Sequence, residues 1–154
     1  MPESGIYILG LGNLGKYVAF ALGRSQQTAG TVSRQSISPV TLLLHRKGLL
    51  DDWEREGRSI RYHTPESLKL QQPPIDESRA SGLRVEFIGN ASGENHGGEN
   101  QNPVIINNER SPIKHLIVTT KTHATTAALA PIKDRLSKDS HILFLQNGIG
   151  MFVV

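Results

Sequence analysis

Three glycines stand at one turn near the N-terminus, in the stretch ILGLGNLG over residues 8–15. The apolar run 5–10 is typical of a strand buried on both faces. After the glycines, apolar residues recur at helical spacing and predict a helix that ends at Gly23. Because a rigidly held glycine costs backbone entropy, this turn needs a reason. Either a ligand approaches the backbone closely, or the chain turns tightly with no ligand.

A strand before GxGxxG and an amphipathic helix after it predict a dinucleotide-binding turn. In such a turn Gly10 permits the tight bend, Gly12 lets a pyrophosphate reach the backbone, and Gly15 lets the helix pack closely on the strand. The phosphates would lie among the N–H groups of the helix N-terminus. The alternative is a purely structural turn. The predicted contacts are the turn residues Gly10, Leu11, Gly12, Asn13, Leu14 and Gly15.

The rest of the chain alternates apolar runs with helical patterns, which favours parallel strands joined by right-handed crossovers. We therefore predict a Rossmann-type, doubly wound α/β fold with a mainly parallel sheet. One domain is expected over 1–154, with a poorly ordered polar insert over about 64–112. Trp53 is expected to pack in the core, and Pro131 to kink the last helix or begin a second one. The expected strands are 39–46, 58–64, 83–89, 113–121 and 140–150 (the last one buried), the expected helices are 47–57 and 122–136, and the expected loops include 25–38 and 64–82.

The end of the second expected strand, LLLHRKG, indicates which dinucleotide would bind. NAD-binding proteins of this class place a carboxylate there for the ribose 2′-hydroxyl, but the next carboxylate in this chain is Asp51. Arg46 and Lys47 would instead pair with a 2′-phosphate, which favours NADP(H). The alternative is that both are solvated surface charges. His45 either stacks near the adenine or is a partly buried structural histidine.

Composition narrows the function classes further. The chain has no cysteine, which excludes disulfides and thiolate chemistry and fits a reducing, cytoplasmic location. Its net charge is only +3 and the basic residues are scattered, so nucleic-acid binding is not expected. The N-terminal apolar run is too short for a signal peptide or a membrane span. None of the histidines has metal-ligand spacing, so no metal site is expected.

Four motifs in order, ILGLGNLG, HRKG, LIVTTKTHAT and LQNGIG, resemble the N-terminal NADP-binding domain of the ketopantoate reductase (2-dehydropantoate 2-reductase) family. The resemblance implies that Lys121 and Asn147 line the cleft where nicotinamide and a small 2-oxo acid substrate meet. It also implies NADP(H) contacts from Thr119, Thr120, Lys121 and Asn147. Both Lys121 and Asn147 lie at the C-terminal ends of expected parallel strands, where doubly wound folds bind ligands. The alternatives are an exposed lysine and an ordinary Asn-Gly turn.

The implied activity is NADPH-dependent reduction of ketopantoate, or a similar 2-oxo acid, to the 2-hydroxy acid, as in pantothenate biosynthesis. The resemblance implies family members about twice as long, with a C-terminal helical domain that carries the general acid and much of the dimer contact, and we expect these 154 residues to lack that domain. The alternative is a non-catalytic NADP-binding module or a truncated product without activity. Besides the substrate, the expected partner of the chain is a second copy of itself or the missing C-terminal domain.

Overall fold

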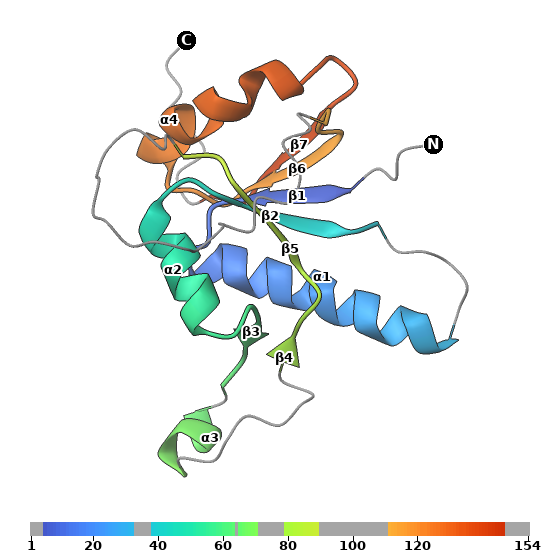
Figure 1. Cartoon of the computed structure of the whole chain (residues 1–154), viewed down its shortest axis with the longest axis vertical. Coiled ribbons are helices and arrows are strands. Elements are labelled where there is room, and N and C mark those ends of the chain that lie inside the picture. Colours follow the sequence, from blue (N-terminus) through green and yellow to red (C-terminus); the bar gives the residue numbers. More distant parts are fainter. Residues whose placement is uncertain (1–4, 33–37, 64, 71–78, 90–110, 147–154) are drawn as a thin grey trace, which may run out of the picture.

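The computed structural model describes residues 5–32, 38–63, 65–70, 79–89 and 111–146 (Figure 1). Five parallel strands form one sheet in the order β5-β2-β1-β6-β7. This arrangement, with helices on both faces, confirms the predicted Rossmann-type α/β fold. The strands are β1 (Ile6–Leu9), β2 (Val40–Leu44), β5 (Arg84–Phe87), β6 (His115–Val118) and β7 (His141–Phe144).

The strand order reverses direction beside β1. The chain moves outward from β1 to β2 and β5, then returns to β6 on the other side of β1 and continues to β7. Ile8 of β1 therefore pairs with Leu42 of β2 and with Ile117 of β6. The carboxyl end of such a switch point is where open parallel sheets bind ligands.

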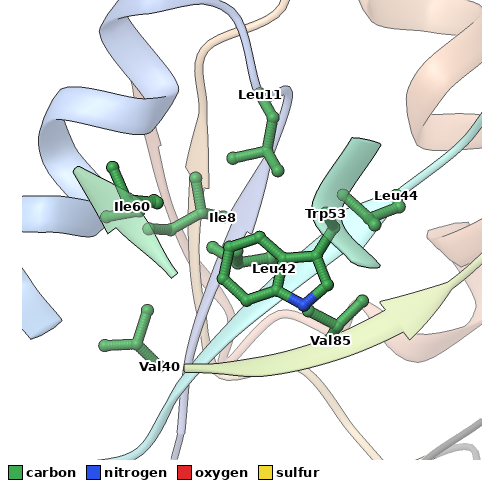
Figure 2. Packing of buried hydrophobic residues seen from close by; sticks show 9 residues of the cluster. Ile8, Leu11, Val40, Leu42, Leu44, Trp53, Ile60 and Val85 are labelled. Atoms are coloured by element: carbon green, nitrogen blue, oxygen red, sulfur yellow. The ribbon is translucent and has the colours of Figure 1, made fainter. Parts of the chain in front are cut away.

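Alternating side chains of the strands divide the core into two layers. Ile8 and Leu42 point to the face covered by α1 (Asn13–Val32) and α2 (Lys47–Arg55), whereas Leu9 and Leu43 point to the opposite face. That second face is covered by the short helices η2 (Thr122–Ala124), α4 (Thr125–Leu129) and η3 (Ala130–Arg135) (Figure 1). Trp53 packs among Leu42, Leu44 and Val85, as expected (Figure 2).

Helix α1 is longer than the sequence predicted, because it does not end at Gly23. It continues through the expected loop to Val32. Gly23 is buried, and a Cβ there would lie 3.1 Å from Leu83 and 3.2 Å from Ala80. The glycine is therefore a close-packing position where the helix crosses the chain around β4, not a helix end.

Two further expectations for the middle of the chain are wrong. The strand expected at 58–64 is only β3 (Ile60–Arg61), which lies outside the main sheet and pairs antiparallel with β4 (Arg79–Ala80). The loop expected at 64–82 contains the strand β4 and the short helix α3 (Pro65–Lys69). The two-residue pairing forms because Ile60 and Ala80 bury themselves against the core beside α1.

Strand β7 was expected to be buried, and this is also wrong. It forms the edge of the sheet, and Ile142, Leu143 and Phe144 are 38%, 53% and 39% exposed. Apolar composition alone cannot distinguish a central strand from an edge strand. The start of η3 is as expected, with Pro131 in its first turn, where a missing N–H costs nothing.

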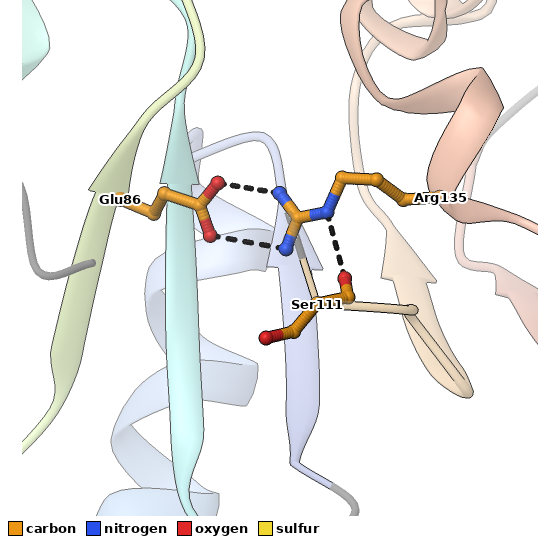
Figure 3. A network of polar contacts seen from close by, with 3 residues as sticks. All are labelled: Glu86, Ser111 and Arg135. Atoms are coloured by element: carbon orange, nitrogen blue, oxygen red, sulfur yellow. Dashed lines mark hydrogen bonds and ion pairs between the residues drawn. The ribbon is translucent and has the colours of Figure 1, made fainter. Parts of the chain in front are cut away.

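A buried ion pair joins the η3 layer to β5. The Arg135 guanidinium donates to both carboxylate oxygens of Glu86, and its Nε donates to the carbonyl oxygen of Ser111 at 2.9 Å (Figure 3). The same guanidinium lies 5.4 Å from the centre of the Tyr7 ring, within cation–π range. The side chain of Arg135 is only 8% exposed, so the pair is an internal tie between sheet and helices.

Candidate cofactor site at the carboxyl edge of the sheet

Three predicted site segments meet at the carboxyl edge of the sheet, beside the switch point. Leu9, at the end of β1, pairs with Leu43 near the end of β2 and with Val118 at the end of β6. The glycine turn follows Leu9, the Arg46 segment follows β2, and the Thr119 segment follows β6. The register therefore brings together segments that lie far apart in the sequence.

The glycine turn has the shape that the sequence pattern requires. Gly10 has φ +101°, and a Cβ there would lie 2.8 Å from the Thr120 nitrogen. A Cβ on Gly15 would overlap the carbonyl oxygen of Gly10. At Gly12, by contrast, no atom of the described residues beyond Gly12 itself and its chain neighbours lies within 4 Å of the Cβ position. Gly10 and Gly15 are thus needed for packing, whereas Gly12 faces open space that a ligand can enter.

Helix α1 presents its N-terminus to this open space. Its first internal hydrogen bond runs from the Lys16 N–H to the Gly12 carbonyl oxygen at 2.9 Å, and the preceding N–H groups of a helix have no such partner. Asn13 and Leu14 are exposed, and the first turn contains no acidic residue. This end of the helix can therefore attract and hydrogen-bond an anion such as a phosphate.

The basic residues after β2 lie on the surface of the same edge. Arg46 and Lys47 are exposed, and Arg46 precedes the first residue of α2 without using its side chain to cap that helix. His45 is half-buried, and its Nδ1 is enclosed without a hydrogen-bond partner among the described residues. Burial, and secondly the positive charge of Arg46, lower the pKa of His45 below its usual value.

The threonines after β6 direct their hydroxyls into the protein. Thr119 Oγ1 donates to the Gly10 carbonyl oxygen at 2.6 Å. Thr120 is only 8% exposed, and its hydroxyl is hydrogen-bonded to that of Thr125 at 3.1 Å. Both residues border the edge where a cofactor was expected, but their side chains hold neighbouring segments together. A direct contact between either residue and a cofactor stays a prediction.

The two predicted positioning residues differ in how far the structure describes them. Lys121 is exposed at the turn between β6 and η2, and its carbonyl oxygen accepts a hydrogen bond from Thr125 Oγ1 at 3.2 Å. Asn147 lies outside the described residues, as do Gly148 and Gly150. The residue before Asn147 is described: Gln146 Nε2 donates to the Thr120 carbonyl oxygen at 2.7 Å and to Thr125 Oγ1 at 2.6 Å. The end of the β7 segment is thereby held against the turn that carries Lys121.

Sequence reasoning did not single out Gln146 or Thr125. Gln146 lies in the motif LQNGIG, and Thr125 is the last residue of LIVTTKTHAT. The available signal for such residues was a polar side chain that follows an apolar strand within a motif already assigned to the site. The described residues contain no group of three or more His, Asp or Glu side chains that could hold a metal ion. No helix in the described ranges is long and apolar enough to cross a membrane.

Comparison with known proteins gives consistent matches. A family model described as ketopantoate reductase PanE/ApbA matches residues 6–152. The probable 2-dehydropantoate 2-reductase of Schizosaccharomyces pombe is 29% identical over 148 residues, which cover 94% of this chain and 33% of that protein. The 2-dehydropantoate 2-reductase of Saccharomyces cerevisiae is 43% identical over 42 residues, 27% of this chain and 11% of that protein. The chain spans about a third or less of the length of the curated relatives it matches.

Proposed function

The chain belongs to the ketopantoate reductase family, and we propose that it binds NADP(H) at the carboxyl edge of its sheet. It would supply the cofactor-binding part of an NADPH-dependent reduction of 2-dehydropantoate, or a similar 2-oxo acid, to the 2-hydroxy acid. The observation that carries the proposal is the open position at Gly12, beside the N-terminus of α1 and next to the switch point of the sheet. Both relatives named above carry the name 2-dehydropantoate 2-reductase.

The residues at the edge fit the phosphates of a dinucleotide. The space at Gly12 would admit a pyrophosphate to the backbone, where the N–H groups that precede Lys16 have no partner within the helix. Gly10 and Gly15 allow no side chain, so the turn is closely packed against β6 and has a defined shape. A preorganised turn of this kind loses little conformational entropy when it binds.

The choice of NADP over NAD rests on the charges after β2. Arg46 and Lys47 are exposed cations at the position where NAD-binding proteins of this class use a carboxylate. A guanidinium can pair with a phosphate through two parallel hydrogen bonds, whereas a carboxylate there would repel the phosphate. These residues therefore favour a cofactor with a 2′-phosphate.

Lys121 would bind the substrate. The nicotinamide, when bound, supplies the hydride that a ketone accepts. The exposed Lys121 ammonium lies after β6, on the other side of the switch point from Arg46, and would pair with the carboxylate of a 2-oxo acid. By the family resemblance, Asn147 would orient the carbonyl from the neighbouring strand end, since its amide both donates and accepts. Gln146 and Thr125 would hold this part of the edge in place.

Binding and turnover assays test the proposal. Calorimetry should show that the chain binds NADPH more tightly than NADH. Absorbance at the nicotinamide band should then report whether ketopantoate causes NADPH oxidation. The resemblance places the proton donor in a domain outside these residues, and general acid catalysis contributes about 10²–10⁴-fold. We therefore expect this 154-residue polypeptide to turn over well below about 1 s⁻¹. Equal affinity for NADH and NADPH would refute the NADP assignment, and turnover of about 1 s⁻¹ or above would show that no proton donor outside these residues is needed.

A further inference from the structure

Thr119 connects the end of β6 to the glycine turn through both its backbone and its side chain. Its N–H donates to the Leu9 carbonyl oxygen at 2.9 Å and continues the pairing of β1 with β6. Its hydroxyl donates to the Gly10 carbonyl oxygen at 2.6 Å and also lies 3.3 Å from the Leu9 carbonyl oxygen, a longer and weaker contact. The single proton of the hydroxyl is committed to these carbonyl oxygens, so it is not available as a donor to a ligand.

The third glycine of the motif makes room for this hydrogen bond. A Cβ on Gly15 would lie 2.6 Å from Thr119 Oγ1 and would also overlap the Gly10 carbonyl oxygen. The hydroxyl and the carbonyl thus occupy the space above Gly15. On its other side Gly10 lies close to Thr120, because a Cβ on Gly10 would meet the Thr120 nitrogen at 2.8 Å. The Gly10 peptide is therefore enclosed between the end of β6 and the first turn of α1.

The orientation of the Gly10 carbonyl affects the residues that follow it. The same peptide plane carries the N–H of Leu11, and the next one carries the N–H of Gly12, at the open position. Without the Thr119 hydroxyl, the Gly10 carbonyl oxygen loses this partner, and packing alone orients the Gly10–Leu11 peptide less firmly. The N–H groups would then no longer be held at one orientation toward a phosphate.

We propose that Thr119 is a positioning residue that fixes the phosphate-binding turn through the Gly10 carbonyl, without contacting the cofactor itself. This inference rests on the proposed cofactor site. It differs from the expectation drawn from the family resemblance, in which Thr119 contacts the cofactor directly. It predicts that the Thr119 hydroxyl matters for ligands that contain a pyrophosphate and has no effect on a ligand that lacks one.

The test uses Thr119→Val, which removes the hydroxyl at nearly constant volume, and Thr119→Ser, which keeps it. NADPH, ADP and adenosine 2′-monophosphate are titrated into the chain and followed by NMR. For Thr119→Val, the affinity for NADPH and ADP should fall about fivefold to tenfold, the effect of one neutral hydrogen bond. The affinity for adenosine 2′-monophosphate, which lacks a pyrophosphate, should stay within about twofold. Thr119→Ser should bind all three ligands like the unmodified chain.

A matched control is Thr126→Val, the same substitution at an exposed position on α4, which should change none of the affinities. Should Thr119→Val fail to fold, Thr119→Ala removes the hydroxyl without adding bulk and should give the same selective loss. Unchanged NADPH affinity in the folded hydroxyl-free variant overturns the inference, as does an equal loss for all three ligands. If the unmodified chain binds neither NADPH nor ADP, the proposed cofactor site itself is wrong.

Discussion

A substitution at Gly15 should lower the stability of the fold, whereas a larger side chain at Gly12 should abolish NADPH binding and leave the fold intact. The two glycines lie three residues apart, with Gly12 just before the first residue of α1 and Gly15 in its first turn. A Cβ at Gly15 would overlap a backbone carbonyl oxygen, which cannot move as a flexible side chain can. Beyond its own chain neighbours, a Cβ at Gly12 would meet no described atom within 4 Å, and Gly12 does not have the positive φ of Gly10. A methyl group is therefore a packing problem at one position only.

The magnitudes follow from these surroundings. Overpacking typically costs 1–3 kcal/mol, and we expect Gly15→Ala to lie at the upper end, about 3 kcal/mol, because the overlap is with backbone. At 2–4 °C per kcal/mol, its Tm should fall by roughly 6–12 °C. For Gly12→Ala, the reduced entropy of the unfolded chain stabilises by about 0.4–1 kcal/mol. Alanine is less favourable than glycine at the helix N-cap, and this destabilises the chain by about the same amount, so the two effects nearly cancel. Its Tm should therefore change by no more than roughly 3 °C.

Circular dichroism and calorimetry separate the two effects. Gly12→Val should keep the circular dichroism spectrum of the unmodified chain and lose NADPH binding, because its side chain fills the space that the pyrophosphate would enter. Gly12→Ala is the matched control for stability, and Gly15→Ala measures the cost of overlap. Normal NADPH affinity in Gly12→Val would show that the turn binds no phosphate. A large loss of stability in Gly12→Ala would show that the space at Gly12 is not open.

Three other perturbations test the remaining features. Arg46→Ala should reduce the preference for NADPH over NADH about tenfold or more, since a charge-assisted contact contributes about 1.5–3 kcal/mol. The control in the same calorimetric titration is Arg84→Ala, because Arg84 is an exposed arginine at the amino end of β5, away from the carboxyl edge of the sheet. The pKa of His45 is lowered in the folded chain, so the unfolded chain binds the proton more readily, and this residue contributes stability above pH about 6.5 that is lost as the pH falls below it. Chemical unfolding at several pH values should show that the unfolding free energy of His45→Gln changes less with pH over this range than that of the unmodified chain. An identical pH dependence would contradict the assignment. Glu86→Gln should lower the free energy of unfolding by about 3 kcal/mol, because Arg135 would lose its counter-charge; this is the low end for breaking a buried pair, since Glu86 is 19% exposed. Urea unfolding measures this loss, and a value below about 1 kcal/mol would mean that solvent already screens the pair.

The sequence predicted most of the fold because its strands are marked by continuous apolar runs. The alternation of runs and helical patterns was sufficient to predict the parallel sheet and the glycine turn at the end of β1. It failed where a residue's environment comes from distant segments. Gly23 resembles a helix end, but Leu83 and Ala80 pack on it and the helix continues. The apolar residues of β7 resemble a buried strand, although within the described ranges only β6 pairs with it.

The candidate site was predictable in position but not in detail. Turn residues that follow parallel strands must gather at one edge, so the glycine turn, Arg46 and Lys121 could be assigned to the same edge from their order alone. The direction of each side chain could not. Thr119 and Thr120 stand where ligand contacts were expected, yet their hydroxyls bond to Gly10 and Thr125. A hydroxyl reaches only its immediate neighbours, and the sequence does not state which neighbours folding brings there.

The edge combines one rigid part with one exposed part, and this division should govern how its ligand preference can change. The glycine turn is packed closely against Thr119 and Thr120, the two residues that follow β6, and neither Gly10 nor Gly15 has room for a Cβ. The Thr119 hydroxyl also donates to the Gly10 carbonyl oxygen. Arg46 and Lys47 instead project from the surface, and Arg46 makes no capping bond to α2. Changes at Gly10 or Gly15 therefore act on folding and on phosphate binding together, whereas changes at Gly12 act on phosphate binding. Changes at Arg46 act on the 2′-phosphate alone, since substitutions of exposed residues usually change stability by less than about 0.5 kcal/mol.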